Sequence, residues 1–417
     1  MTQTDDLKRD ARAFFDAAVT AADPALALRK ALSASPFPKP MGRTLVIAIG
    51  KAAPRMMAEA LSHIDGPHEA LAVTHHENDM DVDGATVLRA GHPVPDEAGA
   101  SAAKDVMALL ARATVDDQVI ALISGGGSAL VPAPKLPMSL ADKAVVNKLL
   151  LGGGLDIVKM NLVRQQLSEL KGGGYLRHAA PAPVTAYILS DVIGDDLRAI
   201  ASGPTVGPIG TRSEAREILE GADLWAKLPD SARGILEQPD EAQETPDATN
   251  ILIGSNRHSI AAMEEAATSA GYAARVVSDA LEGDVDDAAQ EVINAVGPVD
   301  QPTALLFGGE TTVVLRGDGR GGRNQELALR VAMHMPKLES SWVFLSGGTD
   351  GRDGPTDAAG GIVDAGTKDR IIANGHDPKA LLDNNDSYAA LEAAGDLLIT
   401  PATGTNVADV QALLIRP

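Results

Sequence analysis

One local pattern recurs along this chain and limits the folds that it can adopt. A short, mostly apolar run stops at a glycine or a small polar residue, and a helical stretch usually follows. Such runs lie at 45–50, 119–123, 184–189, 251–253, 303–307, 342–345 and 396–399. Apolar runs of this length are typical of strands buried on both faces, as in parallel sheets covered by helices. The pattern predicts layered α/β architecture with polar residues collected at the carboxyl ends of the strands.

The length of 417 residues is more than one core comfortably fills, so two or three domains are expected. Segment 238–250, QPDEAQETPDATN, is polar, contains proline and has no apolar period, which favours a boundary there. The prediction is an N-terminal, Rossmann-like α/β domain with a mostly parallel sheet, residues 1–240, and a C-terminal α/β domain, residues 250–417. Two leading helices within 5–34, separated at Pro24, are assigned to the N-terminal domain.

Charge and composition limit the partners of the chain. A formal net charge of -21 and only 3% aromatic residues do not suit binding of nucleic acid. Cysteine is absent, which excludes disulfides, thiolate metal sites and cysteine nucleophiles. The first residues, MTQTDDLKRDARAFF, carry acids where a secretory signal has bases, and no apolar run approaches a membrane span. We expect a cytoplasmic protein that binds neither nucleic acid nor membrane; the sequence leaves a homo-oligomer open.

The glycine-rich loop that follows the run 342–345 is a candidate metal-binding loop. Its sequence, residues 346–361, is SGGTDGRDGPTDAAGG. Six glycines let the backbone fold closely around a ligand, while Asp350, Asp353 and Asp357 offer the oxygen ligands that suit Mg²⁺. A flexible acidic loop is the alternative. Asp350 lies nearest the strand and is the stronger candidate, whereas the other two aspartates are expected to shape the loop.

Two further strand ends favour binding of an anion. Lys51 follows Gly50 where a strand ends and a helix begins, so exposed backbone N–H groups and a mobile positive charge face the same point. The surroundings do not match a Walker A loop, and an ordinary surface lysine is the alternative. Segment 124–128, SGGGS, can form a nest of backbone donors, although a close turn between strand and helix would need the same small residues.

Other polar segments of the chain also carry candidate binding residues. Asp191 follows an apolar strand directly, where a carboxylate can hold Mg²⁺ or accept a hydroxyl proton. Segment 320–326, RGGRNQE, presents Arg323 and Asn324 at a helix start, and a guanidinium there can bind a small carboxylate through two parallel bonds. Asn161, Arg164 and Lys171 are interpreted as a solvated helix face. The nine histidines show no metal-binding spacing and are interpreted as structural or surface residues.

Segment 317–322 formally satisfies the G-x-G-x-x-G pattern of a dinucleotide-binding loop. Gly308 and Gly309, however, lie between two short apolar runs and predict a hairpin, whereas the fingerprint needs the first strand of a βαβ unit. Charged Asp318 and Arg320 also occupy positions where that motif packs tightly. Dinucleotide binding is therefore disfavoured.

Taken together and in chain order, these segments resemble the class II, MOFRL-type glycerate 2-kinases. The segments that carry the resemblance are GKAA (50–53), GHPVPD (91–96), SGGGS (124–128), SDVIGD (190–195), GGET (308–311), GRNQE (322–326), SGGTDG (346–351) and TGTNVAD (403–409). The likeness covers nearly the whole chain. It implies ATP-dependent, Mg²⁺-dependent phosphorylation of D-glycerate on its 2-hydroxyl, giving 2-phospho-D-glycerate and ADP, with the active site in a cleft between two domains. Members are often labelled hydroxypyruvate reductases.

The resemblance and the local patterns lead to one hypothesis for the site. Lys51 neutralises the transferring phosphoryl group, Asp191 and Asp350 hold Mg²⁺ or orient the substrate hydroxyl, and Arg323 binds the carboxylate of D-glycerate; which aspartate accepts the proton stays open. Residues expected at the nucleotide or in supporting polar roles are Ser124, Gly125, Gly126, Gly127, Ser128, Glu310, Asn324 and Asn406. The alternatives are an NAD(P)H-dependent hydroxypyruvate reductase and a non-catalytic sugar-acid binding protein.

Overall fold

The computed structural model describes residues 2–240 and 244–417. Internal contacts divide the chain into two compact units. The N-terminal unit comprises Ala27–Ser190 and Asp195–Ile253, and the C-terminal unit comprises Met1–Leu26, Asp191–Gly194 and Gly254–Pro417. Residues 241–243 of the expected boundary segment lie outside the described residues. The expected cleft stays a prediction, and each unit is described by itself.

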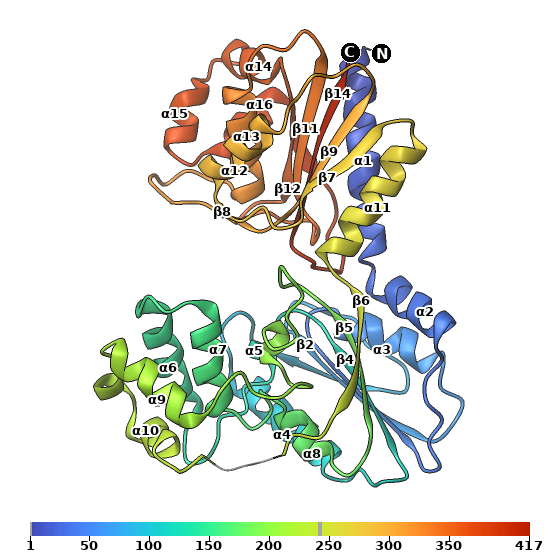
Figure 1. Ribbon diagram of the computed structural model, residues 1–417, viewed down its shortest axis with the longest axis vertical. Helices are drawn as coiled ribbons and strands as arrows, with labels where there is room; N and C mark the ends of the chain where they lie inside the picture. The colour runs from blue at the N-terminus through green and yellow to red at the C-terminus, as the bar shows by residue number, and fades with distance from the viewer. Residues whose placement is uncertain (1, 241–243) are drawn as a thin grey trace. The chain divides into compact units, whose positions relative to one another are not determined.

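A six-stranded sheet forms the centre of the N-terminal unit (Figure 1). Its strands are β1 (Thr44–Ile49), β2 (His68–His75), β3 (Thr86–Ala90), β4 (Gln118–Ile123), β5 (Val184–Leu189) and β6 (Ala248–Gly254). The spatial order is β3-β2-β1-β4-β5-β6, and the pairs from β3 through β5 are parallel. All residues of β1, β4 and β5 are buried, as their unbroken apolar runs predict. The expected Rossmann-like, mostly parallel sheet is confirmed.

The helices of the N-terminal unit fall into two groups. Those that contact the sheet include α3 (Ala53–Leu61) and α4 (Glu97–Leu110). A separate small core unites α6 (Leu140–Gly152), α7 (Ile157–Gln166), α9 (Arg212–Gly221) and α10 (Asp230–Leu236). The unit also contains α2 (Pro24–Ala34), α5 (Gly127–Leu130) and α8 (Gly174–Ala179). Ser139 and Thr211 begin α6 and α9 with reciprocal capping boxes, which explains where these helices start.

The C-terminal unit contains a second six-stranded sheet of mostly antiparallel strands. Its strands are β7 (Ala273–Ser278), β9 (Thr303–Gly309), β11 (Ser341–Gly348), β12 (Ala358–Asp364), β13 (Leu397–Ile399) and β14 (Asp409–Arg416), in the order β13-β12-β11-β14-β9-β7. Only the β7–β9 pair is parallel. Parallel pairing was expected from the apolar runs, but those runs reflect burial on both faces, and two-sided burial does not fix strand direction.

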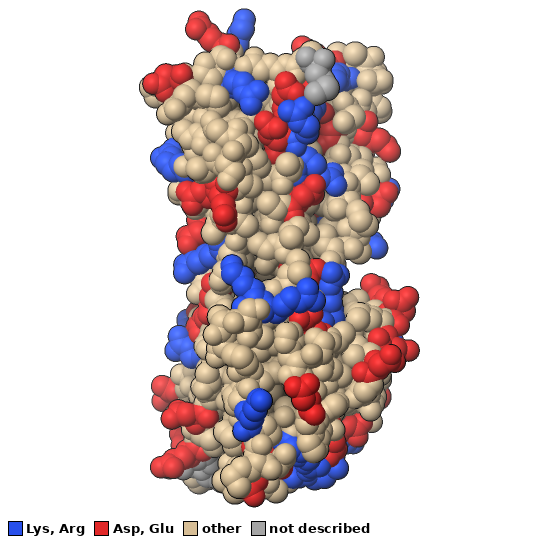
Figure 2. All heavy atoms as spheres, turned by 90° about the vertical axis from the view of Figure 1, so that its right-hand side faces the viewer, with Lys and Arg blue, Asp and Glu red and all other residues tan. Residues whose placement is uncertain are grey.

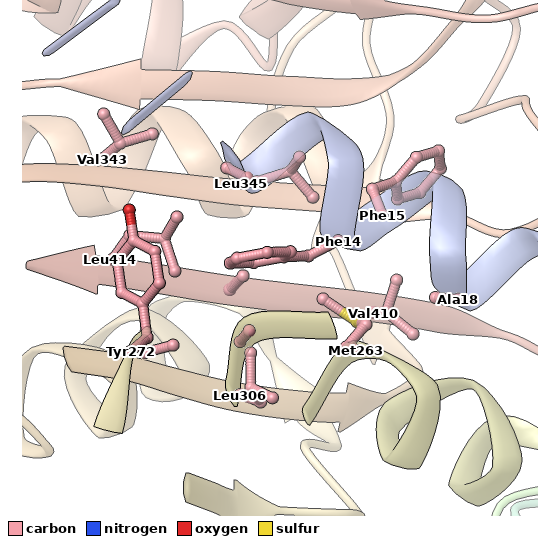
Figure 3. Packing of buried hydrophobic residues seen from close by; sticks show 14 of the residues in the cluster. Phe14, Phe15, Ala18, Met263, Tyr272, Leu306, Val343, Leu345, Val410 and Leu414 are labelled. Atoms are coloured by element: carbon pink, nitrogen blue, oxygen red, sulfur yellow. The ribbon is translucent and has the colours of Figure 1, made fainter. Parts of the chain in front are cut away.

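Helices cover both faces of this second sheet and produce that burial. One core includes residues of α1 (Gln3–Ala21) and α11 (Asn256–Ser269), and the other includes residues of α12 (Val285–Asn294) and α13 (Arg323–His334). Beyond α13 lie α14 (Thr367–Ala373), α15 (Pro378–Asp383) and α16 (Ser387–Ala394). Figure 3 shows Phe14 and Phe15 of α1 beside Leu345 of β11 and Val410 of β14. The assignment of the leading helices to the N-terminal domain is therefore corrected for α1, whose apolar face completes the C-terminal core.

The segment after β9 does not form the expected hairpin. Strand β10 (Thr311–Thr312) instead pairs in parallel with β8 (Gly283–Asp284). The glycine-rich stretch that follows packs against the α15–α16 connection, because Gly319 N–H donates to the Asn384 carbonyl at 2.9 Å. A Cβ atom at Gly317 would lie 2.2 Å from Asn384 Oδ1. This close backbone packing explains Gly317 and Gly319 without a bound dinucleotide.

Charged side chains of both signs are spread over the face of the molecule drawn in Figure 2. Among residues 2–240 and 244–417, no helix combines the length and the apolarity that crossing a membrane requires.

Candidate active site

The carboxyl edge of the N-terminal sheet brings together residues from four strand ends. Lys51 follows β1, His75 ends β2, His92 follows β3, and the SGGGS loop 124–128 follows β4. These four strands are neighbours and run in the same direction, so their carboxyl ends share one edge. The two anion-binding candidates of the sequence, Lys51 and 124–128, therefore belong to the same site.

Close backbone contacts join the β1 end to the β4 end. Lys51 N–H donates to the Gly125 carbonyl at 2.9 Å, and Ala52 N–H donates to Ser124 Oγ at 3.2 Å. Gly50 adopts φ +134°, and a Cβ atom there would lie 2.1 Å from Ser124 Oγ, so only glycine fits. The turn that carries Lys51 is thus fixed by the loop beside it.

The Lys51 side chain and the His92 ring meet above the SGGGS loop. A Cβ atom at Gly126 would lie 3.3 Å from Lys51 Cγ and 3.1 Å from the His92 ring, so the glycine leaves room for both. Burial, followed by the charge of Lys51, lowers the pKa of His92 to about 4 and also lowers the pKa of His75. With their pKa values lowered, both imidazoles are mainly neutral at pH 7, so neither adds a full positive charge to that of Lys51.

The interpretation of all nine histidines as structural or surface residues stays a prediction, but the position of His75 and His92 near Lys51 makes these two candidates for the site. The sequence contains a signal for that position, because His75 ends an apolar run and His92 follows the next one. Metal-binding spacing does not reveal this relation, which arises because neighbouring parallel strands end together.

Lys171 lies deeper in the N-terminal unit and is only 4% exposed. Its Nζ donates to the Ser128 carbonyl at 3.2 Å, to Ser202 Oγ at 3.3 Å, and also to Ser128 Oγ. Asn161 is buried as well. The interpretation of Asn161 and Lys171 as a solvated helix face is therefore wrong: Asn161 is buried on α7, and Lys171 lies beyond the end of that helix, against the segments bearing Ser128 and Ser202.

Arg323, the first residue of α13, is held by two carboxylates of the C-terminal unit. Its Nε and Nη2 donate to Asp409 at 2.6 and 3.1 Å, and its Nη1 lies 2.8 Å from Glu310 Oε1. Burial lowers the pKa of Arg323, but the hydrogen bonds and charge of Asp409 outweigh it and raise the pKa above its ordinary value. Partial burial, together with the Asp409 and Asp191 carboxylates, raises the pKa of Glu310 although Arg323 opposes this.

Asp350 lies on the same side of the loop as Asp409. A Cβ atom at Gly348 would lie 3.2 Å from Asp350 Oδ1 and 3.5 Å from Asp409 Oδ1, so both carboxylates border this glycine. Asp350 Oδ1 also accepts a hydrogen bond from Arg352 N–H at 3.0 Å, which stabilises the turn. The C-terminal unit thus brings together the predicted residues Glu310, Arg323 and Asp350. It adds Asp409, which is the last residue of the TGTNVAD motif and for which the sequence indicates no role.

Asp353 stabilises the start of α13 rather than facing a ligand. It is 3% exposed and accepts hydrogen bonds from Asn324 N–H at 3.1 Å and Gln325 N–H at 2.8 Å. Burial raises its pKa to about 6 although these backbone bonds favour the charged form. Asp357, also expected to shape the loop, accepts a bond from Tyr388 Oη at 2.9 Å.

Two predicted polar residues support the loops of the C-terminal unit. Asn324 is 1% exposed, and its Oδ1 accepts a hydrogen bond from Ser346 Oγ at 2.6 Å, so it lies behind the site. Asn406 is half-buried, and its Oδ1 accepts from Ala408 N–H at 3.1 Å, which fixes the turn before β14. Both contacts fit the supporting roles, while direct nucleotide contact by these residues stays a prediction.

Across the part of the chain that the structure describes, no three His, Asp or Glu side chains converge into a metal-binding group. Mg²⁺ in phosphoryl-transfer sites usually takes one or two carboxylates, with waters and substrate phosphates completing its shell. Asp191 and Asp350 supply oxygen donors of that kind, so the residues present fit a metal that is bound together with a nucleotide.

Comparison with known proteins gives one consistent family. A model described as a domain of unknown function, DUF4147, matches residues 10–237, and the MOFRL family model matches residues 303–409. The chain is 40% identical to a glycerate 2-kinase of Pyrococcus horikoshii, covering 90% of this chain and 88% of that protein. It is 38% identical to a D-glycerate 2-kinase of Thermotoga maritima, covering 89% and 90%.

A putative hydroxypyruvate reductase of Agrobacterium vitis is 39% identical, covering 97% of this chain and 93% of that protein. Among solved structures, the glycerate kinase of Thermotoga maritima superposes with a TM-score of 0.92 at 35% identity, covering 99% of this chain and all of that one. The matches extend over both units, so they include Lys51 of the N-terminal unit and Arg323 of the C-terminal unit. The chain therefore belongs to the class II, MOFRL-type glycerate 2-kinase family.

Proposed function

We propose that this protein transfers the γ-phosphoryl group of ATP to the 2-hydroxyl of D-glycerate and releases 2-phospho-D-glycerate and ADP. The observation that carries the proposal is that Lys51 lies against the backbone of the SGGGS loop, with two neutral imidazoles nearby. Similar kinases across most of the chain length support the same reaction.

Phosphoryl transfer depends mainly on positioning and on neutralising charge. In the proposed reaction Lys51 neutralises the transferring group and the loop 124–128 offers backbone donors. The 2-hydroxyl oxygen attacks the γ-phosphorus, the bond to ADP breaks, and the hydroxyl proton passes to a carboxylate, either Asp191 or Asp350. These two aspartates would hold Mg²⁺, which when bound neutralises charge on the phosphates.

Arg323 stays the candidate for the D-glycerate carboxylate. Three of its five N–H groups face Asp409 and Glu310, which leaves two for a substrate oxygen. The two acids hold the guanidinium in one orientation, and a fixed orientation reduces the entropy cost of binding. Glu310, Asn324 and Asn406 complete the proposal as supporting residues.

A coupled assay tests the proposed function. The purified protein receives ATP, Mg²⁺ and D-glycerate, and the product is coupled to enolase either directly or through phosphoglycerate mutase. The proposal predicts a signal without mutase, because enolase accepts the 2-phosphate directly. A signal only with mutase would place the phosphate on another hydroxyl, and absence of ADP would exclude the kinase. NAD(P)H oxidation on adding hydroxypyruvate without ATP would favour a reductase instead.

A cytoplasmic location and assembly into a homo-oligomer stay predictions from the sequence. Cell fractionation tests the first, and light scattering of the purified protein tests the second.

A further inference from the structure

Three basic side chains of the N-terminal unit lie on α6, on α7, which packs with α6 in one small core, and in the turn that follows α7. They are Lys143 on α6, Arg164 on α7 and Lys171 in the segment after α7. Within residues 2–240 and 244–417, none of the three forms an ion pair, and each has its pKa lowered, first by burial. The charges of Arg164 and Lys143 also contribute at Lys171. Like charges are thus gathered where burial already disfavours them.

Within the part of the chain that the structure describes, the hydrogen-bond partners of Arg164 and Lys171 are neutral groups. Arg164 Nε donates to Asn147 Oδ1 at 3.2 Å, and its Nη1 approaches Asn161 Oδ1 at 3.4 Å. The Lys171 ammonium donates to the carbonyl and hydroxyl of Ser128 and to the hydroxyl of Ser202. Amide and hydroxyl oxygens satisfy N–H donors but do not compensate a positive charge.

The backbone beside Lys171 is also strained. Ala201 and Ser202 adopt φ values of 48° and 62°, in the left-handed region that side chains other than Asn and Asp rarely occupy. Strain of this kind concentrates at ligand sites and at switch regions. It places the Ser202 hydroxyl against Lys171 and, at 3.2 Å, against Ser128 Oγ.

We propose that Lys143, Arg164 and Lys171, together with the Ser128 hydroxyl, bind a phosphate group of the nucleotide phosphoryl donor. The inference rests on the proposed kinase function and names a part of its donor site. Three cations suit a polyphosphate better than a single carboxylate. Ser128 belongs to the SGGGS loop whose other end contacts Lys51, so the cluster continues the site at the carboxyl edge of the sheet.

Lys171→Met tests the proposal, because the replacement keeps the length of the side chain and removes its buried charge. Without ligand, we expect the thermal midpoint of the variant to equal or exceed that of the wild type, since the methionine side chain has no amino group whose charged form burial disfavours. Its affinity for ATP, measured by calorimetry without D-glycerate, should fall about 10-fold to 100-fold, as for a lost charged hydrogen bond. The KM for ATP should rise in parallel while the KM for D-glycerate stays unchanged.

Lys148→Gln is the matched control, because Lys148 is an exposed lysine on the same helix as Lys143. It removes the same formal charge and should leave the affinity for ATP unchanged. If Lys171→Met fails to fold, Arg164→Gln and Lys143→Gln carry the test with the same expected loss. These two positions are only partly buried.

The outcomes separate this inference from the proposed function. Wild-type affinity for ATP in an active Lys171→Met enzyme would overturn the inference and leave the kinase standing. If the wild-type protein binds ATP but yields no ADP, and the variant no longer binds ATP, the phosphate-binding inference stands and the proposed kinase function is overturned. A rise in the KM for D-glycerate alone would assign the cluster to the acceptor's carboxylate and overturn the nucleotide assignment. A lower midpoint with unchanged affinity would mean a purely structural role.

Discussion

The two units treat buried positive charge in opposite ways. In the C-terminal unit, Arg323 lies against Asp409 and Glu310, so its charge is compensated within the protein. In the N-terminal unit, the Lys171 ammonium donates to hydroxyl and carbonyl oxygens and forms no ion pair with any residue that the structure describes. The difference teaches that removing one partner of a paired charge leaves the other uncompensated, whereas a buried charge without an acidic partner already bears that cost in the folded protein. Substitutions should therefore affect activity and stability differently in the two units.

The largest effect is expected at Lys51. Lys51→Ala should reduce kcat by about 100-fold to 1000-fold, the usual loss when one group that stabilises transition-state charge is removed. The thermal midpoint should change little, because the described contacts of the Lys51 turn are made by its backbone. Steady-state assays and a melting curve on the same preparation check both statements. Near-normal turnover would remove Lys51 from the mechanism and weaken the contrast between the units.

Asp409→Ala should produce the opposite pattern, with stability affected first. Removing the carboxylate leaves the partly buried Arg323 with one acidic partner, which should lower the free energy of unfolding by about 1–3 kcal/mol. Urea denaturation measures the change. A double-mutant cycle with Arg323→Met supplies the control, since the Asp409→Ala loss should shrink once the guanidinium is absent. If Asp409→Ala lowered the free energy of unfolding equally in the wild type and in Arg323→Met, the ion pair between Asp409 and Arg323 would not contribute to stability.

A pH-dependent effect on the free energy of unfolding is expected at Asp353, because burial raises its pKa from 3.8 to about 6. The associated stabilisation is fully present below about pH 4 and is lost as pH rises through about 6. Asp353→Asn should therefore destabilise the protein more at pH 4 than at pH 7, by about 2–3 kcal/mol. Urea denaturation at the two pH values measures this difference, and a pH-independent loss would show that Asp353 acts through its backbone hydrogen bonds alone.

The smallest effect is expected from titration of His92. Its pKa of about 4 keeps the imidazole neutral throughout pH 5–8, so this residue should introduce no break into the rate profile there. An NMR titration of the ring protons should give a midpoint near 4. A midpoint near 6.5 would mean that the ring is more solvated and less influenced by Lys51 than described, and would place a second titrating cation beside Lys51.

The sequence was most informative where a residue's role follows from its place at a strand end. The N-terminal parallel sheet, Lys51 and the loop 124–128 could be placed because buried strands and the glycines after them leave a local signature. Asp409 could not be assigned, because its partner is 86 residues away and only the pairing of β14 brings them together. The burial of Lys171 could not be predicted, because this residue lies in a turn beyond α7 and its contacts come from segments 31 and 43 residues away, which local spacing does not encode.

The position of β14 also affects how the protein is made. This strand lies in the middle of its sheet, between β11 and β9, while α1 from the other end of the sequence covers the same core. Translation delivers α1 first and residues 409–416 only after nearly the whole chain has followed. Until then the apolar side of α1 lacks its final partners, and transiently exposed apolar surface of this kind favours aggregation. The parallel sheet of the N-terminal unit, by contrast, is complete once β6 has emerged from the ribosome.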